Sequence, residues 1–215
     1  MKKVKQLFLV LLMPLLAFSI SAYAGKYTEG KQYTKVNETL SSKAEVREYF
    51  SFYCPHCFSA EPFMEAIKKS LPNNVKFERN HVDFLRAASP KIQAMLSKAV
   101  VVAEQLGMDE KLIGAIFKYL QVQRAVITSE KDIRNIFVLN GADGEKVDKL
   151  MKSFSVNSKA KSMKKYQDTM SKKGALKGVP TIIVNGKYRI NNKELDRKNP
   201  EEDYKNLVAY LLTLK

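Results

Sequence analysis

The chain has two cysteines, Cys54 and Cys57, and only two residues separate them. The segment Val46 to Phe52 is rich in aromatic residues, comes just before the pair and predicts a β-strand. Apolar residues at four-residue spacing over 58–71 predict a helix directly after it. A Cys-x-x-Cys pair between a strand and a helix is typical of a redox-active dithiol. This arrangement predicts an α/β fold that carries both thiols just beyond the end of one strand.

The two intervening residues, Pro55 and His56, favour a reactive first thiol. Cys54 would lie at the start of the helix, where unpaired backbone N–H groups and the helix dipole favour negative charge. His56 can add a donor or a positive charge, and Pro55 fixes the turn although it has no N–H. Because only a thiolate is nucleophilic and a stabilised thiolate favours the reduced pair, we expect a low pKa for Cys54 and an oxidising disulfide.

Two other uses of the cysteine pair stay open from the residues alone. Zinc normally takes four ligands, and besides carboxylates the chain offers only Cys54, Cys57, His56 and His81. Because His56 lies in the same tight turn as both cysteines, joint coordination would be strained, and we expect no metal. A purely structural disulfide would close a loop too small to constrain the unfolded chain much.

Residues 1–24 have the pattern of a secretory signal. They begin with three lysines, continue with an apolar run and end in Ala22-Tyr23-Ala24, which is small at the two positions that a signal peptidase recognises. We expect cleavage before Gly25 and export of the remaining chain. An uncleaved anchor is the alternative, but the apolar run contains Pro14 and is short for a span of roughly 20 residues.

The charge balance is strongly basic, with 37 Lys and Arg against 22 Asp and Glu and a formal net charge of +15. A basic chain can bind nucleic acid, anionic lipid or acidic partners. The basic residues are scattered, however, without a run of five and without alternation with aromatic residues. This pattern indicates a solvated surface, so we expect no nucleic-acid partner and no stable membrane insertion.

The remaining signals predict a sheet that helices interrupt. Residues 25–43 are polar and are expected to form a loosely packed arm. Ser129 with Asp132 three residues later predicts a helix start. The other expected elements are a strand over 75–84, helices throughout 86–165, a hairpin of 181–184 and 188–190 around Asn185-Gly186, and a last helix from Pro200.

Several segments together resemble the DsbA family of periplasmic thiol:disulfide interchange proteins. The resemblance extends over nearly the whole chain after residue 24, and the Cys-Pro-His-Cys form of the motif is typical of that family. The segments that carry it are Gly30-Lys31-Gln32-Tyr33, Glu48-Tyr49-Phe50-Ser51-Phe52-Tyr53, Cys54-Pro55-His56-Cys57, His81-Val82, Gly178-Val179-Pro180 and Val184-Asn185-Gly186-Lys187-Tyr188.

The resemblance implies a thioredoxin fold over 25–85 and 166–215, with an all-helical insertion over 86–165. It implies that Cys54 forms the mixed disulfide with substrate and that Cys57 resolves it. Reduced exported proteins would be the substrates, a DsbB-like membrane protein would reoxidise the pair, and no cofactor beyond the disulfide is expected.

The resemblance also gives a role to Val179 and Pro180. It implies that they form a loop facing the cysteines, with a cis peptide bond at Pro180, and that the loop backbone pairs with an extended substrate. From the residues alone, an ordinary trans proline at the start of a strand is the better expectation.

Two charged residues lie on otherwise apolar strand faces. Glu48 shares a face of the first strand with Val46 and Phe50, and Arg79 shares a face of the second with Phe77. Because buried charges are usually paired, we expect the two to meet beneath the motif and to tune Cys57 or pass protons to it. Alternatively, both reach solvent at the sheet edge. The family typically has lysine where Arg79 stands, and arginine holds its proton too firmly for a relay.

The expected function is therefore a disulfide oxidoreductase that donates the Cys54–Cys57 disulfide to newly exported proteins. A reductase or isomerase working from the dithiol form is the second hypothesis. No dimerisation domain is recognisable, which counts against a dimeric isomerase and favours a monomer. A third hypothesis is a peptide-binding chaperone or assembly factor whose cysteines are vestigial. The basic charge suggests a further one, in which the protein serves as the dedicated partner of a single acidic exported enzyme.

Overall fold

The computed structural model describes residues 25–37, 39 and 41–214, and the signal sequence expected over 1–24 lies outside the described residues. Five strands form one sheet in the order β1-β5-β4-β2-β3. The strands are β1 (Tyr33–Lys35), β2 (Glu45–Phe50), β3 (Lys76–His81), β4 (Thr181–Val184) and β5 (Tyr188–Ile190). The strand expected over 75–84 is thus shorter than predicted.

The central strand, β2, is parallel to β3 and antiparallel to β4. Its parallel register pairs Glu48 with Arg79, and its antiparallel register pairs Val46 with Val184. Alternate β2 side chains point to opposite faces of the sheet. Val46 packs with one group of buried residues and Tyr49 with another, so each face of the sheet has its own apolar contacts.

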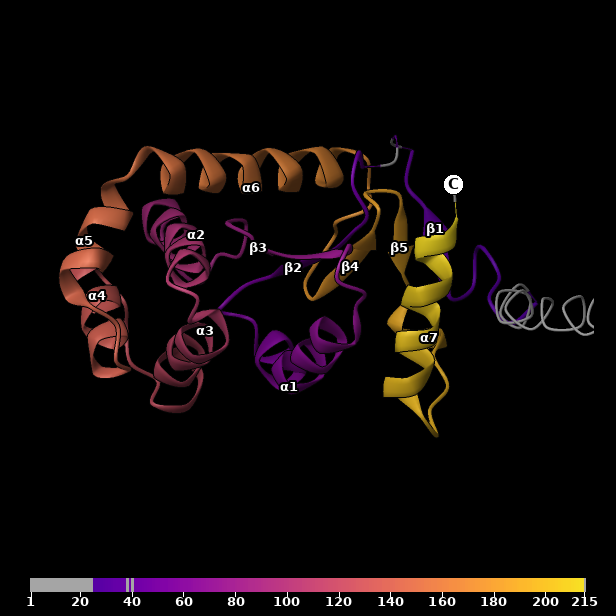
Figure 1. The fold of residues 1–215 in the computed structure, drawn as a ribbon, viewed down its shortest axis with the longest axis horizontal. Coiled ribbons are helices and arrows are strands. Elements are labelled where there is room, and N and C mark those ends of the chain that lie inside the picture. The colour runs from indigo at the N-terminus through magenta and orange to yellow at the C-terminus, as the bar shows by residue number, and fades with distance from the viewer. Residues whose placement is uncertain (1–24, 38, 40, 215) are drawn as a thin grey trace, which may run out of the picture.

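Three helices cover the two faces of the sheet (Figure 1). They are α1 (Pro55–Ser70), α6 (Phe154–Lys172) and α7 (Pro200–Thr213). Ile67 of α1 and Leu207 of α7 pack with Val46 on one face, whereas Met170 of α6 packs with Tyr49 on the other. The sheet is therefore the middle layer of a three-layer α/β unit.

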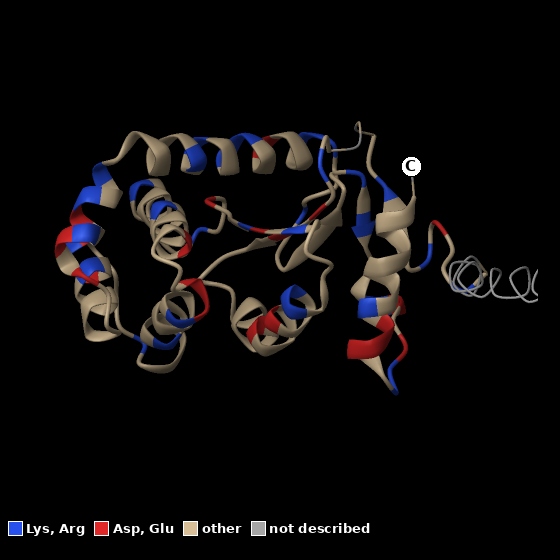
Figure 2. Ribbon diagram, viewed as in Figure 1, with Lys and Arg blue, Asp and Glu red and all other residues tan. Residues whose placement is uncertain are grey.

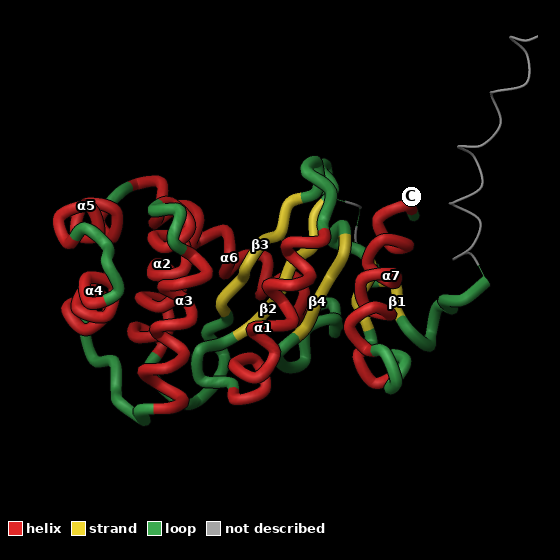
Figure 3. The backbone as a smooth tube through the Cα atoms, turned by 60° about the horizontal axis from the view of Figure 1, so that its bottom comes forward, coloured by secondary structure: helices red, strands yellow, loops and turns green. Residues whose placement is uncertain are grey.

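A second group of helices lies beyond the β2–β3 side of the sheet (Figure 3). These helices are α2 (Pro90–Gln105), α3 (Asp109–Phe117), a π-helix (Lys118–Val122), α4 (Glu130–Leu139) and α5 (Gly144–Lys152). Their buried side chains form one apolar cluster that also contains Cys54 and Cys57. The helical insertion therefore shares its core with the cysteine motif.

The α/β fold with a helical insertion is confirmed, as are several helix boundaries. Ser129 and Asp132 form the expected capping box at the start of α4. Phe154 continues the helical spacing of the apolar residues Val147, Leu150 and Met151, but it begins α6 and is 87% exposed. The expected domain boundary at 165/166 falls inside the uninterrupted α6, and the division into 25–85 with 166–215 and 86–165 stays a prediction.

No helix in the described part of the chain has both the length and the apolar character of a membrane span.

The amino-terminal arm is packed more firmly than its polar composition predicts. The Tyr27 side chain is 4% exposed, and its hydroxyl donates to the Asp203 carboxylate at 2.8 Å. Its ring lies 5.6 Å from that of Tyr210. Tyr33 opens β1 at the edge of the sheet and is also buried. The expectation of a loose arm over 25–43 is therefore wrong for this part, because its aromatic residues bury against α7 and β5.

We predict that Tyr27→Ala lowers the free energy of unfolding by roughly 3–5 kcal/mol, since it leaves a cavity and removes the hydrogen bond to Asp203. Urea unfolding of the oxidised protein from Gly25 onward measures this. Lys31→Ala, at an exposed position of the same arm, should change the value by less than about 0.5 kcal/mol. Equal effects of the two variants would contradict a packed arm.

Candidate active site

The cysteine motif begins helix α1, as the sequence predicts. Cys54 caps the helix in an extended conformation, and Pro55 is the first helical residue. The backbone N–H of Cys57 donates to the Cys54 sulfur at 3.2 Å. Both cysteines are free thiols, and their side chains are buried, with 5% exposure for Cys54 and 0% for Cys57. The orphan N–H groups of the first turn therefore point at the sulfur of Cys54.

The same geometry moves the two thiol pKa values in opposite directions. The pKa of Cys54 falls to about 6, chiefly because the Cys57 thiol donates a hydrogen bond to it, with help from the backbone N–H groups of Cys57 and His56 and from the charge of His56. The pKa of Cys57 rises, because giving that hydrogen bond and being buried both favour its protonated form. At neutral pH the reduced pair therefore holds one thiolate, on Cys54.

Val179 and Pro180 lie against the motif, and the peptide bond between them is cis. The Val179 carbonyl oxygen is 3.4 Å from the Cys54 sulfur. Both residues are partly exposed. The structure thus places this loop beside the thiol that carries the negative charge, 125 residues away in sequence.

Glu48 and Arg79 meet in the interior, on the α1 side of the sheet. Arg79 Nη2 is 3.0 Å from a Glu48 carboxylate oxygen, and the two side chains are 2% and 0% exposed. The expected pairing is confirmed, and the alternative that both reach solvent is wrong. Burial raises the pKa of Glu48 to about 7, although Arg79 opposes the shift. The carboxylates of Glu48 and Glu61 raise the pKa of Arg79 against the effect of burial.

Two further residues at the site were not identified from the sequence. The Glu61 carboxylate of α1 accepts two hydrogen bonds from Arg79, one of them 3.0 Å long. Its position four residues after Cys57 puts both on one helix face, which is a signal that sequence reasoning could have used. Gln121, in the π-helix, donates to the Phe52 carbonyl oxygen at 2.7 Å. No pattern in the sequence indicates this contact, because it depends on how the insertion packs.

His81 is a buried residue that contacts the helical insertion. It is 1% exposed, its Nδ1 lies 3.1 Å from the Ser97 hydroxyl, and burial lowers its pKa to about 3. Across the described residues, no group of three or more His, Cys, Asp or Glu side chains could hold a metal ion.

The model of one protein family, the DSBA-like thioredoxin domain, matches residues 45–199. That range includes the cysteine motif, the charged pair, the helical insertion and the cis-proline loop. The chain belongs to this family. The DSBA-like match therefore extends across the insertion as well as the sheet.

Proteins with the same fold and a similar sequence carry the DsbA name. The thiol:disulfide interchange protein DsbA of Yersinia pestis is 36% identical over 217 residues, which cover 98% of this chain and all of that protein. A crystal structure of the disulfide oxidoreductase DsbA from Proteus mirabilis superposes with a TM-score of 0.76 at 32% identity, over 87% of this chain and 98% of that one. A second Proteus mirabilis DsbA structure, with a non-covalently bound peptide PWATCDS, gives a TM-score of 0.75 at the same identity, over 87% of this chain and 99% of that one. Like these DsbA proteins, the chain is a thiol:disulfide oxidoreductase with a thioredoxin fold and a helical insertion.

In the reduced protein, Cys54 is predicted to titrate with a midpoint of about pH 6. Thiolate absorbance near 240 nm, recorded against pH, measures this midpoint. Because the Cys57 thiol is the largest cause of the low value, Cys57→Ala should raise the midpoint. The matched variant Cys57→Ser keeps a hydroxyl donor and should raise it less. Equal midpoints for the two variants would show that this hydrogen bond does not set the pKa.

Proposed function

We propose that the protein oxidises pairs of thiols in newly exported proteins by donating its Cys54–Cys57 disulfide. The observation that carries this proposal is the asymmetry of the thiols, with a pKa of about 6 for Cys54 and a raised pKa for Cys57. A thiol of low pKa is a good leaving group, and a stabilised thiolate favours the reduced pair. Both properties suit a disulfide donor.

The transfer takes two exchange steps. A substrate thiolate attacks the Cys54 sulfur of the disulfide, a substrate–Cys54 bond forms, and the Cys54–Cys57 bond breaks. Cys57 leaves as a thiolate and takes up a proton, as its raised pKa requires. A second substrate thiolate then attacks the substrate sulfur, which completes the substrate disulfide and releases Cys54 as the stabilised thiolate. The substrate loses two electrons, and the cysteine pair gains them.

The exposed parts of the motif and the loop of Val179 and Pro180 would hold the substrate. The free backbone of such a loop can pair with an extended peptide beside Cys54. A Proteus mirabilis DsbA was solved with a non-covalently bound peptide, and this supports peptide binding by the present protein. His56 is exposed beside Cys54 and adds positive charge there, while Pro55 sets the turn.

The signal pattern of residues 1–24 supports export to the periplasm, where substrates with reduced thiols emerge. Each turnover leaves a reduced pair, so the protein needs an oxidant of its own. By resemblance to its family, a DsbB-like membrane protein would reoxidise it. In Figure 2, Lys and Arg are spread over helices and strands throughout the described chain rather than confined to one element, which does not favour a nucleic-acid partner.

Glu48 is proposed to exchange a proton with Cys57, and Arg79 to hold Glu48 in place. The charge of Glu48 contributes to the raised pKa of Cys57, so the two groups interact. A carboxyl group with a pKa of about 7 can give or take a proton near neutral pH. Arg79 keeps its proton, so it would act as a fixed charge.

The reduction potential of the cysteine pair decides the direction of disulfide transfer. In glutathione buffers, the Cys54–Cys57 disulfide of the protein from Gly25 onward should be much more oxidising than glutathione, because the Cys54 thiolate is stabilised. The fraction of reduced protein, measured by thiol trapping, gives the equilibrium constant. A pair as reducing as that of thioredoxin would reassign the protein as a reductase. Loss of activity in Cys54→Ser would exclude a chaperone with vestigial cysteines.

The proposed proton exchange between Glu48 and Cys57 makes the resolving step depend on pH. Resolution of a Cys54–glutathione mixed disulfide requires the Cys57 thiolate, so its rate should rise through about pH 7 as Glu48 ionises. In Glu48→Gln this step should slow at least roughly tenfold and lose that inflection, since a general base typically contributes a hundredfold or more. Glu65→Gln removes another carboxylate near Arg79 and should keep the inflection. Identical pH profiles for Glu48→Gln and wild type would exclude the proposed role.

A further inference from the structure

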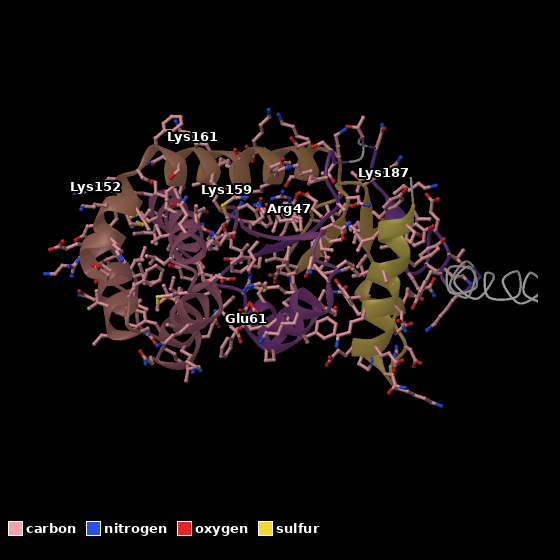
Figure 4. All side chains as sticks on the ribbon, in the orientation of Figure 1. Arg47, Glu61, Lys152, Lys159, Lys161 and Lys187 are labelled. Carbon is pink, nitrogen blue, oxygen red and sulfur yellow. The ribbon has the colours of Figure 1, made fainter. Side chains whose placement is uncertain are left out.

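A cavity lies on the face of the sheet opposite α1. It has a volume of about 690 Å³ and is lined by residues of β2, β3, β4 and α6, together with the segment just before β2. In Figure 4, Arg47 and Lys159 lie between α6 and the sheet, whereas Glu61 lies on the α1 side. The cavity includes Glu45, the first residue of β2, while the cysteines follow the last residue of that strand. It is therefore separate from the redox site.

Positive charge dominates the walls of this cavity. Five cationic and two anionic side chains line it, which leaves a formal excess of three positive charges. The cationic residues are Lys43, Arg47, Lys76, Lys159 and Lys165, and the anionic residues are Glu45 and Glu78.

The two carboxylates are already shared among three of the cations. Glu78 is 4% exposed and forms ion pairs with Lys76 and Lys159, and Arg47 Nη1 lies 3.9 Å from it. Arg47 Nη2 is also 2.9 Å from the Glu45 carboxylate. Although burial opposes ionisation, Lys159 and Lys76 lower the pKa of Glu78. Neither carboxylate is therefore free to neutralise another cation.

The remaining two cations, Lys43 and Lys165, are exposed at the cavity, and no carboxylate pairs with either in the described chain. They come from different elements, the segment before β2 and helix α6. A negatively charged group bound at this part of the cavity would meet two ammonium groups that form no ion pair within the described chain. Partial removal from water strengthens such a contact relative to one on an open surface.

Apolar and aromatic side chains complete the lining. The Tyr166 ring packs on the Arg47 guanidinium, with 4.0 Å between the guanidinium carbon and the ring centroid. Four further lining residues, Tyr49, Met163, Met170 and Ile183, are almost completely buried. Because those four side chains are already covered, the apolar part of a ligand would pack on the exposed Tyr166 ring, which a hydrated inorganic ion would leave in contact with water.

We propose that this cavity is a binding site for a small amphipathic organic anion, a carboxylate or sulfonate attached to an apolar ring or chain. The volume lies within the range of small-molecule sites, and the combination of apolar walls with a few placed charges is typical of them. The acidic group lies between Lys43 and Lys165, and the apolar part packs beside Tyr166. This site is independent of disulfide exchange, so binding is the same in the oxidised and reduced protein.

The test uses 8-anilinonaphthalene-1-sulfonate as the probe and the folded, oxidised protein from Gly25 onward. Calorimetric titration should give one site per chain. Its neutral counterpart without the sulfonate, N-phenyl-1-naphthylamine, should bind at least about tenfold more weakly, because it cannot use the lysines. Sodium sulfate at the same concentration as the probe should not displace it.

Charge reversal locates the site. Lys43→Glu with Lys165→Glu should weaken binding of the probe at least about tenfold, since attraction becomes repulsion. The matched control Lys161→Glu changes an exposed lysine of the same helix that does not line the cavity, and should bind like the wild type (Figure 4). Ser162→Trp fills the cavity while losing only a hydroxyl bond within α6, and should also block binding.

Two outcomes would overturn the proposal. One is an affinity of the double charge-reversal variant within twofold of the wild type, which would place the probe elsewhere. The other is equal binding of the neutral probe, which would reduce the cavity to an apolar crevice without anion selectivity. Circular dichroism and urea unfolding establish that each variant is folded before its affinity is compared.

Discussion

The hydrogen bonds at the start of α1 are the interaction on which the redox site depends. Cys54 takes the position at which a helix leaves its first N–H groups unpaired, and its sulfur accepts from the Cys57 N–H at 3.2 Å. The thiol of Cys57 supplies a further hydrogen bond, so one cysteine stabilises the charge of the other. The turn between β2 and α1 brings these donors together. Burial and the charge of His56 then adjust the pKa of Cys54.

The helical insertion affects the reactivity of the cysteines as well as completing the fold. Its apolar cluster encloses Cys57 completely, and this burial helps to keep the second thiol protonated. Phe117 of α3 packs against Phe52, with 4.9 Å between ring centroids, directly before the motif. Gln121 adds a polar contact to the same strand end. A thioredoxin-like sheet alone would leave this side of the cysteines open to water.

Local patterns in the sequence predict the parts of the molecule that local forces determine. The cysteine motif, the helix caps and the pairing of Glu48 with Arg79 all follow from strand alternation, helix-start signals or the rule that buried charges pair. The resemblance to the family was needed for the loop of Val179 and Pro180. The packed arm around Tyr27 and the contact of Gln121 depend on partners more than 60 residues away, so no local pattern reveals them. Phe154 is a case in which a local pattern misleads. It is apolar and has helical spacing, but it is exposed to solvent at the junction between α5 and α6.

Helix α6 spans both parts of the molecule without a break. It contacts α2 and α5 of the insertion and β3 of the sheet, and its 19 residues include neither Gly nor Pro. Sharp bends in helices usually need one of those residues or an inserted group. The helix therefore holds the insertion at a fixed distance from the sheet. A partner that binds to both parts at once has to fit this distance, because the two parts cannot close around it by bending α6.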